Sequence, residues 1–203
     1  MLESKISIFQ EQKYPLTWWC TEFGKTAPVG HALRQFLPLN WTRFHSLPES
    51  KRYPESEDEY LEIIRRNAMV ASELFQIDEP IYVYKSYYRY EKKLRGKSRH
   101  QVAGRQLRED VSQLFINVGR SHQDEDNQCS VRALVTKWKP DFFERLIRQV
   151  AVFDEAGVSL VSPATKNIFC PYDGGMDIFT FSLNPAELEN KFHSWLSVNS
   201  NKM

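Results

Sequence analysis

Residues 167–182 read NIFCPYDGGMDIFTFS, and this stretch decides the class of fold. Two short apolar runs flank the turn sequence Asp173-Gly174-Gly175. Asp-Gly between apolar runs predicts a tight β-hairpin, and such a turn is expected to place Gly174 at a positive φ. The two strands of a hairpin pair antiparallel, so the sheet to which they belong is expected to be largely antiparallel.

The chain on either side of this hairpin contains further runs rich in β-branched and aromatic residues, which are typical of strands. The expected sheet has about six strands, drawn from seven candidate runs. The predicted strands are 41–47, 80–90, 111–118, 130–138, 158–162, 167–171 and 176–182.

About four helices are expected, and the clearest spans 57–75. Ser56 with Glu59 three residues later forms a capping box, which marks the start of this helix. Its apolar residues recur at steps of three and four, which predicts one buried stripe. That stripe consists of Leu61, Ile64, Ala68, Ala71 and Phe75. Shorter helices are predicted at 28–37, from Pro140 to before Gly157, and after Asn184, which caps the last helix.

The chain of 203 residues carries no linker rich in glycine, proline or serine, so a single domain is expected. The pattern predicts an α+β fold, a largely antiparallel sheet covered by helices. Within the domain, residues 1–27 are interpreted as an N-terminal extension and 85–108 as a basic loop region.

The overall composition gives no bias toward nucleic acid or membrane. The net charge is +1, and no run approaches the roughly 18 apolar residues that a membrane span requires. The cysteines Cys20, Cys129 and Cys170 are odd in number and far apart, which predicts reduced thiols in a cytoplasmic protein. We expect neither a metal nor a cofactor, because no paired ligand spacing is present.

The first candidate site is the segment 43–53, which overlaps the predicted strand 41–47 and continues past its end. His45 is a candidate general base, and Lys51 and Arg52 are candidates for an anion clamp, with Arg43 beside them. A second interpretation is that the segment is a rigid connector in which both cations pair with nearby acids such as Glu55 or Glu59. The sequence leaves both interpretations open.

Asp173 and Asp177, which flank the Gly-Gly turn, form the second candidate. Two carboxylates four residues apart are able to bind a divalent cation, but the alternating pattern of a calcium loop is missing. We favour the simpler interpretation, in which Asp173 is a turn residue and Asp177 accepts hydrogen bonds from neighbouring backbone.

The third candidate is the segment 85–108, which has nine Lys or Arg residues against one Glu. Basic charge interleaved with tyrosines is typical of single-stranded nucleic-acid binding, and equally of docking to an acidic protein. A solvated loop is the remaining interpretation. The residues that would carry binding are Tyr87, Tyr88, Arg89, Arg95, Lys97 and Arg99.

Two strings of the chain resemble a known family. They are RFHSLPESKRY at 43–53 and PYDGGMD at 171–177, and WLS follows at 195–197. Together they are similar to the uncharacterised bacterial family DUF3885, over roughly 40–197. The resemblance implies a bacterial origin and a stand-alone domain, and it brings no activity with it.

The function expected from the sequence is therefore binding. No catalytic spacing is found, so an enzyme is the less favoured class. We expect a small cytoplasmic module that binds a protein partner, with an immunity protein that neutralises a toxin as the specific form. The alternative is a nucleic-acid-binding or nucleic-acid-processing protein of a defence system, which would use the segment 85–108.

Overall fold

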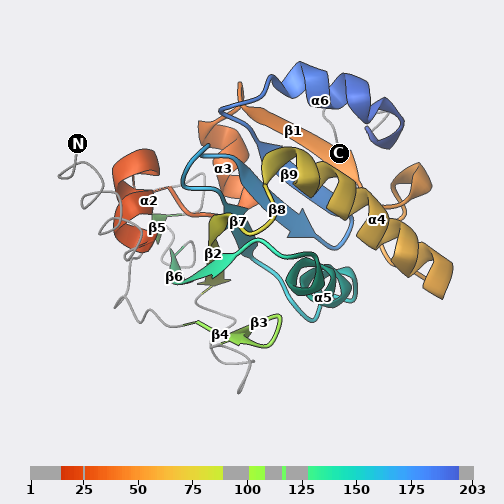
Figure 1. Ribbon diagram of the computed structural model, residues 1–203, viewed down its shortest axis with the longest axis horizontal. Helices are drawn as coiled ribbons and strands as arrows, with labels where there is room; N and C mark the ends of the chain where they lie inside the picture. Colours follow the sequence, from red (N-terminus) through yellow and green to blue (C-terminus); the bar gives the residue numbers. More distant parts are fainter. Residues whose placement is uncertain (1–14, 25, 89–100, 108–115, 118–127, 197–203) are drawn as a thin grey trace.

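The computed structural model describes residues 15–24, 26–88, 101–107, 116–117 and 128–196 (Figure 1). Within them, seven strands form one sheet in the order β1-β9-β8-β7-β2-β6-β5, and each pair of neighbours is antiparallel. The strands are β1 Trp41–His45, β2 Pro80–Tyr88, β5 Ile116–Asn117, β6 Gln128–Lys137, β7 Val158–Val161, β8 Ile168–Tyr172 and β9 Gly175–Phe179. The predicted α+β class and antiparallel sheet are confirmed.

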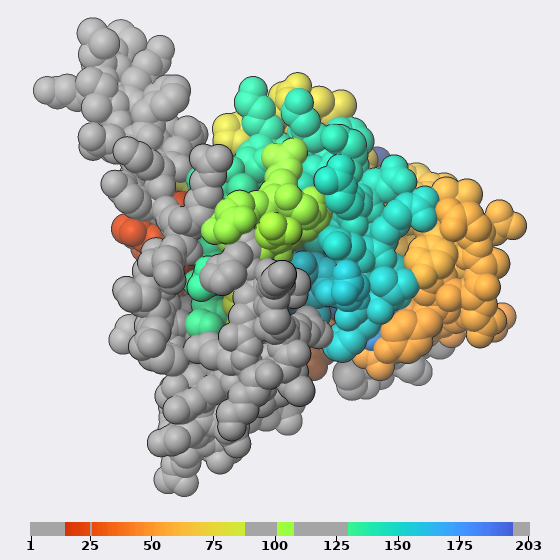
Figure 2. Space-filling view, turned by 90° about the horizontal axis from the view of Figure 1, so that it is seen from below, coloured from red at the N-terminus to blue at the C-terminus, as the bar shows by residue number. Residues whose placement is uncertain are grey.

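A second, two-stranded hairpin of β3 Gln101–Val102 and β4 Arg105–Gln106 lies against the helix α5, Pro140–Ala151 (Figure 2). The guanidinium of Arg105 stacks over the ring of Phe142, 4.8 Å from its centroid. Arg145 donates a hydrogen bond to the carbonyl of Ala103 at 3.4 Å. This hairpin therefore extends the core on the side of α5.

Helices cover both faces of the sheet. On one face lie α4 Glu57–Leu74, α5 and α6 Pro185–Lys191, with the short turns η1 Pro48–Ser50 and η5 His193–Trp195. On the other face lie α2 Pro15–Phe23 and α3 Gly30–Phe36. Alternation along β2 explains the two layers: Ile81 and Val83 belong to the first core, Tyr82 and Tyr84 to the second. None of the described helices has the length and apolarity that crossing a membrane demands.

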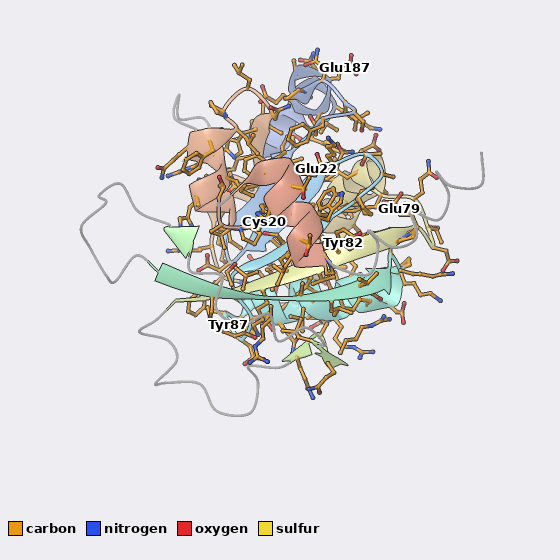
Figure 3. All side chains as sticks on the ribbon, turned by 90° about the vertical axis from the view of Figure 1, so that its left-hand side faces the viewer. Cys20, Glu22, Glu79, Tyr82, Tyr87 and Glu187 are labelled. Carbon is orange, nitrogen blue, oxygen red and sulfur yellow. The ribbon has the colours of Figure 1, made fainter. Side chains whose placement is uncertain are left out.

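The region interpreted as an N-terminal extension contributes to the core where it is described. Trp19 of α2 is fully buried, and its indole donates to the carbonyl of Thr26. Figure 3 shows α2, marked by Cys20 and Glu22, lying across the face of the sheet that carries Tyr82. Residues 1–14 of that region lie outside the described residues.

The buried stripe predicted for α4 is wrong at its N-terminal end. Leu61 is 51% exposed, whereas the buried face runs through Ile63, Val70 and Leu74. Two polar residues, Arg66 and Asn67, belong to this buried face. Apolar spacing alone therefore does not reveal which face of α4 is buried. Both residues are buried because they hydrogen-bond to the connection after β1, Arg66 to the carbonyl of His45 and Asn67 to the hydroxyl of Ser46.

The hairpin of β8 and β9 is confirmed, but the backbone predicted for its turn is wrong. Tyr172 pairs with Gly175, so Asp173 and Gly174 form the turn, and neither has a positive φ. Lack of space explains the second glycine, Gly175, instead. A Cβ on Gly175 would lie 2.2 Å from the carbonyl oxygen of Phe44 on β1, so only glycine lets the two strands approach.

An arginine-lined cleft beside β1 and β9

The pairing of β1 with β9 brings two of the predicted site segments together. Arg43 and Asp177 are register partners, and they form a bidentate ion pair. Arg43 Nε donates to Asp177 Oδ1 at 2.8 Å, and Nη2 donates to Oδ2 at 2.9 Å. Both side chains are largely buried. The interpretation that Asp177 accepts from neighbouring backbone is replaced by this side-chain pair.

Asp177 is enclosed by further neighbours. The indole of Trp41 donates to its Oδ1 at 2.8 Å. Gly30, at the start of α3, passes so close that a Cβ there would lie 2.6 Å from Asp177 Oδ2. The Arg43 guanidinium lies over the rings of Trp41 and Tyr172, at 5.5 and 5.0 Å from their centroids. Asp177 therefore fixes the position of Arg43.

A second ion pair joins the two segments further along. Glu49 and Ser50 both have a positive φ, and this tight turn precedes Arg52. Arg52 Nε lies 2.9 Å from Asp173 Oδ2, and the Tyr53 hydroxyl donates to the same oxygen at 2.9 Å. Asp173 is buried, whereas the Arg52 side chain is 64% exposed.

These groups border a cleft of about 460 Å³. Its walls come from α3, from β1, β8 and β9, and from the loop after α5. Three arginines reach it, together with two aspartates, Tyr172, Cys170 and Phe153. The polar residues that line it are His31, Arg34, Arg43, Arg52, Tyr172, Asp173 and Asp177.

Burial shifts the pKa values of several ionisable groups of the cleft. Burial raises the pKa of the Cys170 thiol far above its usual range, and it raises the pKa of Tyr172 to about 12. The pKa of His31 is lowered by desolvation and by the neighbouring cation of Arg34. At neutral pH, thiol and phenol are therefore protonated, and neither is an activated nucleophile.

The remaining residues of segment 43–53 serve other contacts. His45 is buried, its Nε2 lies 3.3 Å from Ser50 Oγ, and burial lowers its pKa. Lys51 Nζ contacts Glu59 at 2.7 Å and Glu55 at 3.0 Å, which is the pairing that the connector interpretation expected. Lys51 and Arg52 thus do not form one clamp, and only Arg52 reaches the cleft.

The basic segment is described only at its two ends. Lys85 and Tyr87 are buried within β2, and the Lys85 ammonium lies 2.5 Å from Glu155 Oε1. The ring of Tyr87 therefore presents little surface to solvent, and Figure 3 places it on β2 away from α2. Tyr88 belongs to β2, but its side chain is not described. Arg89, Arg95, Lys97 and Arg99 lie outside the described residues.

Sequence reasoning did not single out these residues of the site: His31, Arg34, Trp41, Phe153, Cys170 and Tyr172. Two of them carry a signal. Arg34 follows His31 by three positions on a predicted helix, so both occupy one face. Tyr172 directly precedes Asp173 in the hairpin. Nothing in the sequence pairs Phe153 or Trp41 with the site, because those contacts arise only when distant elements pack.

The metal interpretation of Asp173 and Asp177 finds no further ligands. Among the residues that the structure describes, no three His, Cys, Asp or Glu side chains are placed to share a metal ion. Both carboxylates instead accept from arginine, as described above.

The fold and the site define an α+β protein with a helix-covered antiparallel sheet and an arginine-lined cleft at one edge. The family model described as "Domain of unknown function (DUF3885)" matches residues 29–199, so the chain belongs to that family. The matched range contains all the cleft residues named above. Searches of the curated proteins and of the solved structures find no match.

Proposed function

We propose that the protein is a protein-binding module, and that the arginine-lined cleft with Phe153 at its border is the binding surface. The composition of this surface supports the proposal. Arginine and aromatic side chains are the residues that most often dominate the energy of protein interfaces. Here Arg34, Arg43 and Arg52 converge on a cleft that also includes Tyr172 and Phe153.

Phe153 is the observation that carries the proposal. It is 53% exposed, and its φ of 58° is rare for a bulky residue. Non-glycine residues in this region cost about 1–3 kcal/mol, and such strain gathers at functional sites. The loop after α5 thus holds the apolar ring of Phe153 at the border of a charged cleft. The backbone strain at Phe153 lowers the stability of the fold, and we expect the free energy of binding to offset this loss.

The specific role that we propose is that of an immunity protein, which neutralises a toxin by direct contact. For this role the cleft has to supply only a complementary surface, because neutralisation by direct contact requires no chemistry. The partner is then expected to arrest growth when produced alone, and co-production of this protein is expected to restore growth.

The test is a two-hybrid screen against fragments of the genome that encodes the chain. Each interaction found is repeated with Phe153→Asn, since asparagine tolerates a positive φ and the exchange removes only the apolar ring. Leu61→Asn on α4 is the matched control, because Leu61 is exposed to a similar extent on another surface. We expect an interaction that Phe153→Asn abolishes and Leu61→Asn preserves.

A screen without any interacting fragment would contradict the proposed function. So would an interaction that both variants preserve, because the partner would then bind elsewhere. Thermal unfolding of both purified variants checks that each remains folded.

A further inference from the structure

We propose that the cleft receives a carboxylate side chain of the partner, with Arg34 as its direct ligand. This inference rests on the proposed function and names the chemical group that is recognised.

The two aspartates of the cleft are each matched by one arginine. Asp177 accepts three hydrogen bonds, two from Arg43 and one from Trp41. Asp173 is paired with Arg52 and accepts from Tyr53. Arg34 has no acidic partner among the described residues, so one guanidinium of the cleft lacks a counter-charge.

Arg43 adds a donor that is already held in position. Its Nε and Nη2 are occupied by Asp177, whereas Nη1 has no acceptor within the described part of the chain. The side chain is only 11% exposed and is fixed between the rings of Trp41 and Tyr172. Because Nη1 is held in a fixed orientation, a ligand oxygen that reaches it gains a preorganised hydrogen bond.

The charges that line the cleft favour a carboxylate over a phosphate. One unmatched guanidinium calls for one negative charge, and a planar carboxylate fits arginine in bidentate geometry. A phosphate group carries nearly two charges at neutral pH. The second charge would meet the carboxylates of Asp173 and Asp177, which line the same cleft. Tyr172 and Phe153 then offer apolar surface to the residues that flank the acidic one.

The experiment titrates the protein, labelled with ¹⁵N in its arginine side chains, with three blocked pentapeptides. The probes are acetyl-Gly-Phe-Glu-Phe-Gly-amide, the same peptide with glutamine in place of glutamate, and the same peptide with phosphoserine. We expect saturable shifts of the Arg34 Nε–H signal with the glutamate peptide. Its dissociation constant is expected to be at least about tenfold lower than that of either other peptide.

Arg34→Gln is expected to weaken binding of the glutamate peptide about tenfold or more. Arg148→Gln removes the same charge from α5, where Arg148 pairs with Glu57 and Glu144, and is expected to leave the binding unchanged. The inference is wrong if no peptide saturates the protein, if the glutamine peptide binds equally well, or if Arg34→Gln has no effect. Tighter binding of the phosphoserine peptide would also overturn it.

The two proposals fail in different ways. If Phe153→Asn abolishes binding of the partner from the screen and Arg34→Gln does not weaken it, the protein-binding function stands and the carboxylate site is wrong. If neither variant affects the partner, both proposals are wrong.

Discussion

Arg43 and Asp177 lie opposite each other on β1 and β9, and their side chains meet in two parallel hydrogen bonds of 2.8 and 2.9 Å. They stand 134 positions apart in the chain. The pair forms because β9 returns beside β8 through the Asp173-Gly174 turn and then pairs with β1 along its other edge. The pairing of β9 with β1 thereby places Arg43 and Asp177 together in the lining of the cleft.

Removing one member of this pair is expected to cost more than removing both. Asp177→Asn leaves the Arg43 guanidinium buried without a counter-charge, and the free energy of unfolding should fall by about 3 kcal/mol or more. The double variant Arg43→Met, Asp177→Leu removes the charges together and should recover most of that loss. Urea unfolding of the single and double variants measures the coupling. Equal losses in Asp177→Asn and in the double variant would contradict the expectation that the unpaired Arg43 guanidinium causes the loss.

The two glycines of the hairpin are expected to respond differently to alanine. In Gly175→Ala the new Cβ would lie 2.2 Å from the backbone oxygen of Phe44, so β1 and β9 must separate. We expect a loss of about 1–3 kcal/mol or more in the free energy of unfolding. In Gly174→Ala the nearest atoms are side chains of Tyr172 and Arg52 at 3.3 and 3.4 Å, which can shift, and the loss should stay below about 1 kcal/mol. A larger loss at Gly174 than at Gly175 would contradict this arrangement of the turn.

The sequence predicted the elements well because their signals are local. The capping oxygens of Ser56 and Asn184 act where predicted, each accepting from a backbone N–H of its own helix. The turn backbone at Gly174 and the buried face of α4 were predicted wrongly, because tertiary contacts decide both. Gly175 is required by a neighbouring strand, and Arg66 is buried by its bond to the carbonyl of His45.

The candidate site was predictable only in part, because its segments carry local signals but their pairing does not. The segments containing Arg43 and Asp177 were both singled out, but their pairing depends on which strand neighbours β9, which spacing does not reveal. Lys85 was counted in the basic loop region 85–108 because of its charged neighbours, although the predicted strand 80–90 also contains it. In the structure it lies in β2, an interior strand between β7 and β6, where a buried glutamate compensates its charge.

The stability of the protein is expected to fall on mild acidification, with His45 as one cause. Burial is the main reason that the pKa of His45 lies below its ordinary value of 6.5 in the folded protein. The unfolded chain therefore binds a proton at a higher pH, so the free energy of unfolding declines as pH drops below about 6.5.

Urea unfolding at pH 7.5 and 5.5 measures this decline. The decline in the free energy of unfolding should be smaller in His45→Gln than in the wild type. His193→Gln, at an exposed position, is the matched control and should show the decline of the wild type. The assignment to His45 fails if the decline is as steep in His45→Gln as in the wild type.

The nucleic-acid alternative for segment 85–108 remains a prediction with a direct test. If the segment binds nucleic acid, the protein shifts a single-stranded oligonucleotide, and the affinity falls by about 0.7–0.9 log units per log unit of salt for each phosphate contact. Reversal of Arg95, Lys97 and Arg99 to glutamate should abolish this binding. Absence of binding to RNA and single-stranded DNA at about 50 mM salt rules the alternative out, because electrostatic contacts are strongest there.

Two ion pairs of equal length are expected to differ strongly in their contribution to stability. Lys85 and Glu155 lie 2.5 Å apart with side chains 4% and 6% exposed, and Lys166 and Glu22 lie 2.5 Å apart with side chains 47% and 26% exposed. Glu155→Gln leaves the Lys85 ammonium buried without its counter-charge, which should lower the free energy of unfolding by about 3–5 kcal/mol. Glu22→Gln should lower it by no more than about 1 kcal/mol, since water screens an exposed pair.

The buried pair also connects two parts of the molecule. Lys85 Nζ donates to the carbonyl of Gln101 in β3, and the backbone N–H of the next residue, Ser86, donates to the carbonyl of Gly157 in the wall of the cleft. Glu155→Gln should therefore speed amide hydrogen exchange in the β3–β4 hairpin and at 155–158, whereas Glu22→Gln should leave both regions unchanged. Equal destabilisation by the two variants would show that burial does not set the strength of these pairs. Unchanged exchange in the hairpin would show that Lys85 does not hold it in place.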